Sequence, residues 1–141
     1  MYLFLMNQNV PFHNIIIWKL KLPLKIKIFF WYLQRGVILT KDNLAKRNWI
    51  GSQKCCYCNS NETIQHLFFD CPHAKVIWRV VQVATGISQP RSLAHMAGDW
   101  LSWAKPSEKK IILAGSAALI WAIWHCRNDI YFNNVKYNSF L

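Results

Sequence analysis

The chain has 141 residues, of which 53% are hydrophobic and 15% aromatic, and its formal net charge is +11. The apolar share excludes a disordered chain, and the length is sufficient for one domain with its own core. A domain this basic usually faces a polyanion, either a nucleic acid or an acidic membrane surface.

The first fourteen residues form a partly apolar lead-in without a clear period. Their apolar run is too short for a signal peptide. We therefore expect a reducing compartment, in which the five cysteines bind metal or stay as thiols instead of forming disulfides.

A first helix is predicted from Pro23 to the stop at Gly36, because proline suits a first turn and glycine a helix end. Lysines alternate with apolar residues at its start, so a strand is the alternative, but the alternation ends at Ile28. The apolar residues at helical spacing are Ile26, Phe29, Phe30 and Leu33.

Further helices follow along the chain. Thr40 is expected to cap a short helix over 41–47, and Asn61 a second one over 61–69. A helix from Pro72 to Gly86 follows, and then a linker at 88–92, a short helix over 93–103 and a long helix from about 107. The apolar stripe expected on the helix after Pro72 consists of Val76, Ile77, Val80, Val81 and Ala84.

The longest apolar run covers residues 111–124. A membrane span needs about twenty residues, so we interpret the run as a buried helix and expect no membrane partner. Few stretches alternate as strands do, which makes the predicted fold mostly α.

A cysteine-rich stretch, "CCYCNSNETIQHLFFDC" (55–71), contains four of the five cysteines and a histidine in the pattern C-x2-C-x7-H-x4-C. Three thiolates and an imidazole are a ligand set that binds zinc in a tetrahedron, and a closed set of four makes the metal structural and not catalytic. The predicted ligands are Cys55, Cys58, His66 and Cys71.

Other readings of this stretch remain open. Buried cysteines that bind nothing are common, Cys56 competes with Cys55, and His73 competes with His66 or Cys71. Cys126, inside the long helix, is expected to belong to the core.

The stretch and its surroundings resemble the reverse transcriptase zinc-binding domain of LINE-type (non-LTR) retrotransposon polyproteins. Tyr32 departs from the family, which usually has arginine there, and weakens any phosphate contact at that position. The matching segments, in order, are Trp18, "PLKIKIFFW" (23–31), Thr40, "NLAKR" (43–47), "ETIQHLFFDC" (62–71), "AKVIW" (74–78) and "IWAIWHCRNDIYFNN" (120–134).

The resemblance implies a small helical domain built around a zinc knuckle and followed by a long C-terminal helix. It strengthens the assignment of structural Zn²⁺ to the four ligands, and it implies a nuclear or cytoplasmic localisation. The expected divisions are a lead-in (1–14), the zinc-binding domain (15–85), a linker with a short helix (86–106), the long helix (107–134) and a tail (135–141).

No polymerase or nuclease motif occurs in the sequence, and its six acidic residues do not form the spaced set that two-metal chemistry needs. We therefore expect no catalytic residue, no small-molecule substrate and no enzymatic activity. The family implies a parent polyprotein that is an RNA-directed DNA polymerase, with the reverse transcriptase domain as a possible partner.

Positive charge is concentrated just before the cysteines, since Lys19 to Lys54 contains nine basic residues and one acid, Asp42, a net charge of +8. Basic residues mixed with aromatics suit phosphate contact and base stacking, so RNA or DNA is the expected partner. The predicted contacts are Lys21, Lys25, Lys46, Arg47, Trp49 and Lys54.

The alternative is a structural or protein-interaction zinc module that does not bind nucleic acid. A nucleic-acid module would gather its charges on one face, whereas an interaction module would expose tryptophans and a large apolar patch. Trp18, Trp31 and Trp78 are expected in the core, and Arg127–Asn128 in a helix-capping or packing role.

Overall fold

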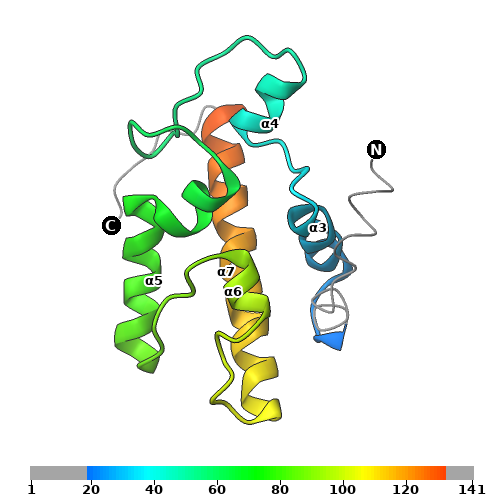
Figure 1. Cartoon of the computed structure of the whole chain (residues 1–141), viewed down its shortest axis with the longest axis vertical. Helices are drawn as coiled ribbons and strands as arrows, with labels where there is room; N and C mark the ends of the chain where they lie inside the picture. The colour runs from blue at the N-terminus through cyan, green and yellow to red at the C-terminus, as the bar shows by residue number, and fades with distance from the viewer. Residues whose placement is uncertain (1–18, 133–141) are drawn as a thin grey trace. The chain divides into compact units, whose positions relative to one another are not determined.

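A computed structural model describes residues 19–132 (Figure 1). These residues form helices joined by loops and contain no strand, only an isolated bridge between Lys54 and Asn61. The prediction of a mostly α fold with a cysteine–histidine cluster and a long C-terminal helix is confirmed. The predicted lead-in and tail, with Trp18, lie outside the described residues.

The described residues divide into two compact units, each discontinuous in sequence. The first unit contains residues 19–38 and 90–119, and the second contains 39–89 and 120–132. The domain bounds expected from sequence, at residues 85 and 107, stay a prediction.

In the first unit, helix α3 (Leu24–Gln34) begins after Pro23 and buries the four apolar residues expected at helical spacing. The chain turns at Gly36, whose φ of 69° is in the left-handed region that glycine adopts without cost. The helical interpretation of this segment is therefore confirmed over the strand. Trp31 is half-buried, with the Arg35 guanidinium 3.7 Å above its ring.

Helix α6 (Leu93–Ala97) also belongs to the first unit and is shorter than the predicted 93–103. The Ser92 hydroxyl caps it by accepting the His95 N–H, and Gly98 ends it. Met96 and Trp100 are buried in this part of the unit.

In the second unit, helix α4 (Lys41–Lys46) begins after Thr40, as expected. The Thr40 hydroxyl nevertheless donates to the Asp42 carboxylate and caps no backbone N–H, so the predicted capping bond is wrong. The hydrogen bond to the first-turn carboxylate sets the orientation of the Thr40 side chain, and in this orientation its oxygen accepts no backbone N–H.

The helix predicted over 61–69 starts later than expected. Asn61 pairs with Lys54, and Thr63 performs the cap, because its hydroxyl accepts the His66 N–H at 3.0 Å. A short π-helical turn, η1 (His66–Asp70), then leads into helix α5 (Pro72–Thr85), which ends at Gly86 with φ 77°.

Helix α5 packs through a different face from the one expected. It buries Ala74 and Trp78, and the Trp78 indole N–H donates to the Phe68 carbonyl at 2.9 Å. The predicted apolar stripe is largely exposed, with Val76 at 46% and Val80 at 64%. The indole fills more space and needs a hydrogen-bond partner, so it and not the valines sets the buried face.

Helix α7 (Pro106–Phe132) buries one face, which includes Leu113, Ala117, Ile120 and Ile123. The run at 111–124 is therefore half-buried, with Ile111 exposed, instead of buried all round. Cys126 is exposed and not in the core, because it lies off this face. None of the described helices is both long and apolar enough to cross a bilayer.

Candidate metal centre and its supporting network

Three parts of the second unit bring their metal-binding side chains to one point. Cys55 and Cys58 lie in the loop closed by the Lys54–Asn61 bridge, His66 begins η1, and Cys71 precedes α5. One ligand atom from each of the four lies within 4.8 Å of all the others.

The separations fit a tetrahedral zinc site. The Cys71 Sγ lies 3.9 Å from the Sγ atoms of both Cys55 and Cys58, and Zn–S bonds of about 2.3 Å in a tetrahedron place sulfurs about 3.8 Å apart. The Cys58 Sγ and His66 Nε2 are 3.1 Å apart. They need to separate by roughly half an ångström to bind the same zinc ion.

The backbone explains why this spacing converges. The Cys55 N–H donates to the Ser60 carbonyl at 2.8 Å and closes the loop, and the Tyr57 N–H donates to the Cys55 sulfur at 3.4 Å. In η1 the Cys71 N–H donates to the His66 carbonyl at 2.7 Å. This wider turn spans five residues, and it brings His66 and Cys71 to the same side of the chain.

Crowding divides the cysteine thiols into different protonation states. The pKa of Cys55 is lowered, chiefly by a hydrogen bond from Cys56 and then by one from Cys71. The pKa of Cys71 is raised by its hydrogen bond to Cys55 and by burial. A divalent cation at the centre would favour the thiolate form of the cysteines that bind it.

The two competing ligands from the sequence lie outside the group of four. Cys56 hydrogen-bonds to Cys55, which raises the Cys56 pKa. The His73 ring stacks on Tyr57, with centroids 4.0 Å apart and planes within 3°. Burial lowers the His73 pKa and favours the neutral ring in this stack.

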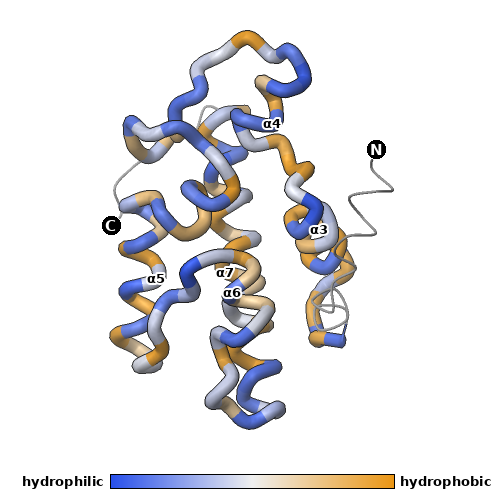
Figure 2. The backbone as a smooth tube through the Cα atoms, viewed as in Figure 1, coloured by the Kyte–Doolittle hydropathy of each residue, from blue (hydrophilic) through white to orange (hydrophobic). Residues whose placement is uncertain are grey.

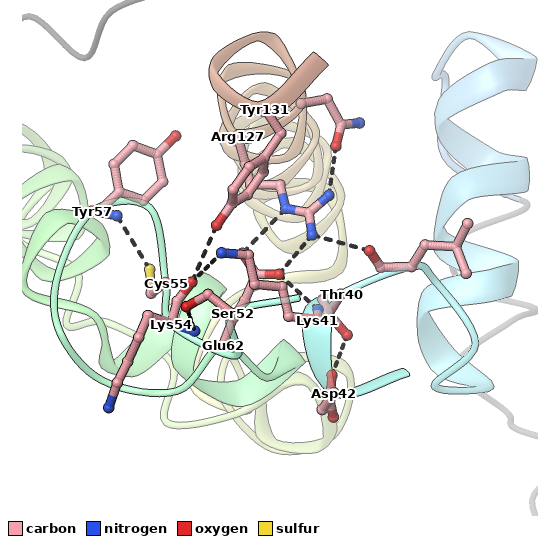
Figure 3. A network of polar contacts seen from close by, with 12 residues as sticks. Thr40, Lys41, Asp42, Ser52, Lys54, Cys55, Tyr57, Glu62, Arg127 and Tyr131 are labelled. Carbon is pink, nitrogen blue, oxygen red and sulfur yellow. Dashed lines mark hydrogen bonds and ion pairs between the residues drawn. The ribbon is translucent and has the colours of Figure 1, made fainter. Parts of the chain in front are cut away.

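A buried ion pair next to the metal cluster was missed by the sequence analysis. Glu62 is 0% and Arg127 1% exposed, and the guanidinium donates to both carboxylate oxygens, at 2.6 and 3.1 Å (Figure 3). The same carboxylate accepts the Lys41 backbone N–H at 2.8 Å, and Arg127 also donates to the Leu39 carbonyl. Every partner is needed, because an unpaired charge at this depth is costly.

A second set of contacts converges on the Lys54 carbonyl, immediately before Cys55. The Tyr131 hydroxyl donates to it at 3.2 Å, and the Lys41 ammonium donates to it as well (Figure 3). The ammonium lies 4.2 Å from the centre of the Tyr131 ring. Burial lowers the Lys41 pKa, and the Glu62 charge opposes that shift.

The predicted nucleic-acid contacts are exposed in both units. Lys21 and Lys25 are exposed in the first unit. In the second, Lys46 is exposed at the end of α4, and the loop that follows exposes Arg47 and Lys54, with Trp49 40% exposed. Lys41, one of the nine basic residues, is buried and committed to the network.

Comparisons with known proteins agree with this site. A family model described as zinc-binding in reverse transcriptase matches residues 1–78, over half of the chain. A putative ribonuclease H protein of Arabidopsis thaliana is 31% identical over 86 residues, which are 60% of this chain. The chain spans about 14% of the length of that relative. No solved structure matches the chain.

Proposed function

The chain belongs to the zinc-binding family found in reverse transcriptases, and we propose that it is a zinc-stabilised module that binds single-stranded nucleic acid and catalyses no reaction. Its Cys3His group is positioned to hold the metal ion. The observation that carries the proposal is an exposed basic–aromatic loop that leads directly into that group.

The zinc ligands in this proposal are Cys55, Cys58, His66 and Cys71. Four protein ligands complete a tetrahedron and leave no position for water or substrate, so the metal acts as a scaffold. When bound, zinc would supply folding free energy to a loop with little core of its own.

The segment from residue 46 to residue 54, the basic loop, has mostly exposed side chains. Its hydropathy is mostly hydrophilic, interrupted by a short apolar stretch (Figure 2). Asn48 takes a left-handed φ of 67°, which asparagine tolerates, and turns the chain after α4. The loop's cations are Lys46, Arg47 and Lys54.

Glycine is required where the Trp49 ring crosses the backbone. A Cβ built on Gly51 would lie 2.1 Å from the nearest indole carbon, so only glycine permits this approach. In this conformation the indole lies against the Gly51 backbone, and Trp49 is 40% exposed. The exposed Trp49 indole, with cations before and after it in the loop, suits stacking on an unpaired base.

The local charge favours phosphate. No acidic residue occurs between Asn43 and Asn61, and Glu62 beyond them is neutralised by Arg127. The loop therefore retains its positive charge, and phosphate binding there would release counterions and weaken as salt rises.

The test is a fluorescence-anisotropy titration of labelled single-stranded RNA, with single-stranded DNA in parallel, by the zinc-loaded full chain at low and physiological salt. Its variant replaces the loop cations by alanine (Lys46→Ala, Arg47→Ala, Lys54→Ala). A control with the same loss of charge replaces Lys105, Lys109 and Lys110 of the first unit.

We expect micromolar or tighter binding that weakens with salt, a loss of about 10-fold or more in the loop variant, and a smaller loss in the control. Chelation of zinc should abolish binding. A folded, zinc-loaded chain that does not bind at low salt, or equal losses in the two variants, would contradict the proposal.

A protein-interaction module is the second candidate, and one observation favours it. Val76, Val80 and Val83 form an exposed apolar strip on α5, and Trp103 in the first unit is 64% exposed. In a longer polyprotein such surfaces would contact neighbouring domains, such as a reverse transcriptase or ribonuclease H domain. Nuclear or cytoplasmic localisation stays a prediction.

A further inference from the structure

We propose that Arg127 and Tyr131, near the end of α7, are positioning residues for the metal centre, so that the functional zinc unit extends from residue 39 to residue 132. The inference rests on the ligand assignment proposed above and is independent of nucleic-acid binding. The family match ends at residue 78, before α7 begins.

The contact nearest the metal is the one to the Lys54 carbonyl. Lys54 precedes Cys55, and its peptide carbonyl accepts from the Tyr131 hydroxyl and from the Lys41 ammonium. The peptide that joins Lys54 to Cys55 is therefore held on its carbonyl side by α4 and α7. The N–H of the same peptide, that of Cys55, donates to the Ser60 carbonyl. Fixing both sides limits the directions in which the Cys55 sulfur can point.

Tyr131 keeps its proton for this role. Burial raises its pKa, and the Glu62 charge raises it further, so the hydroxyl remains a donor at neutral pH. Its ring contacts two cations, with the Lys41 ammonium 4.2 Å and the Arg127 guanidinium 4.6 Å from its centre. These contacts fix the ring and so direct its hydroxyl at Lys54.

Arg127 acts one step further from the metal. It pairs with Glu62, which holds the Lys41 backbone N–H, and it donates directly to the Leu39 carbonyl. Through Lys41, α7 is thus connected to both ends of the segment that carries the basic loop. Glu62 itself lies four residues before His66, so the same pair fixes the chain on either side of the Cys55–Cys58 loop.

Outer-shell groups that orient metal ligands typically change metal affinity by about 10- to 100-fold when they are removed. We therefore expect Tyr131→Phe to weaken zinc binding by about 10-fold. Arg127→Lys keeps the charge but loses the bidentate hydrogen-bond geometry, and it should weaken zinc binding by at least as much. Tyr32→Phe, the same chemical change on an exposed tyrosine of α3, should have no effect.

The experiment is a competition titration of zinc between the full chain and a chromophoric chelator. The absorption spectrum of the Co²⁺-loaded chain is recorded for each variant. Ile123→Val, a core change in the same helix, serves as a control for general destabilisation. Tyr131→Phe should weaken zinc binding and shift the cobalt–thiolate bands, whereas Ile123→Val should leave the bands in place.

Unchanged zinc affinity and cobalt bands in both Tyr131→Phe and Arg127→Lys would overturn the positioning role while leaving the four ligands intact. A wild-type chain that fails to bind zinc would instead overturn the ligand assignment, and the positioning role with it. Neither outcome depends on RNA binding, so this experiment does not test the nucleic-acid proposal.

Discussion

The metal centre with its network and the basic loop are adjacent in the second unit, but they are built in opposite ways. Around the metal centre, Glu62 and Arg127 are buried and the ion pair is supported by further hydrogen bonds. In the loop, the cations and Trp49 are exposed. The contrast indicates that fixed internal contacts hold the loop's ends, while its side chains stay exposed.

The largest effect should come from removing the metal. Chelation, or Cys58→Ser, removes the free energy that zinc binding contributes to folding. In zinc-finger peptides this contribution is about 10 kcal/mol or more. We expect hydrogen-exchange protection across residues 55–71 to be reduced, because the metal joins the loop that carries Cys55 and Cys58 to His66 and Cys71. Retained protection in the chelated chain would show that the network alone holds the centre.

Breaking the buried ion pair should have the next largest effect. Glu62→Gln leaves Arg127 as a buried charge without its counter-ion, and such losses cost about 3–5 kcal/mol. Chemical denaturation of the zinc-loaded chain measures the change.

The double variant Glu62→Leu with Arg127→Met removes both charges and should recover most of that stability. It should not recover zinc affinity, because Lys41 and Leu39 lose their anchor. If both single and double variants unfolded with equal ease, the cost would lie in packing and not in the unpaired charge.

A smaller effect is expected at Trp78. Trp78→Phe keeps an aromatic ring in the core but removes the N–H that satisfies the Phe68 carbonyl, and an unsatisfied buried carbonyl costs about 1–3 kcal/mol. Thermal unfolding gives the value. Val80→Thr, on the exposed face of the same helix, is the matched control and should stay within about 0.5 kcal/mol.

The smallest effect on stability belongs to the basic loop. Replacing Lys46, Arg47 and Lys54 by alanine should change the free energy of unfolding by about 0.5 kcal/mol or less per site. Zinc affinity should be equally unaffected, since only backbone atoms of Lys54 join the network. A large loss of zinc affinity would mean that the loop side chains support the metal centre and that the two regions are not separate.

The helices and the four clustered residues could be predicted because the patterns that specify them lie within short segments of the sequence. The period of Ile26, Phe29, Phe30 and Leu33 defines α3, and the spacing from Cys55 to Cys71 lies within one short segment. Metal chemistry further restricts which residue types can converge at one point.

The network could not be predicted in the same way. Glu62 and Arg127 are separated by 65 positions, and a glutamate near a predicted helix start is more simply interpreted as a first-turn charge. The composition contained a signal that was missed. Glu62 is one of only six acidic residues in a chain with seventeen lysines and arginines, and it lies within the metal-binding stretch. The prediction of a buried stripe on α5 was wrong for a related reason. Periodicity shows that a helix has an apolar face, but not which face packs against the rest of the protein.

X-ray absorption spectroscopy at the zinc edge, on the full chain purified with one equivalent of metal, tests the central claim most directly. The account predicts three sulfur ligands at about 2.3 Å and one nitrogen at about 2.0–2.1 Å, with the nitrogen contribution absent in His66→Cys. Four sulfurs in the unmodified chain would exclude His66 as a ligand and would require a fourth cysteine in its place. A shell of oxygen and nitrogen ligands would contradict the Cys3His centre altogether.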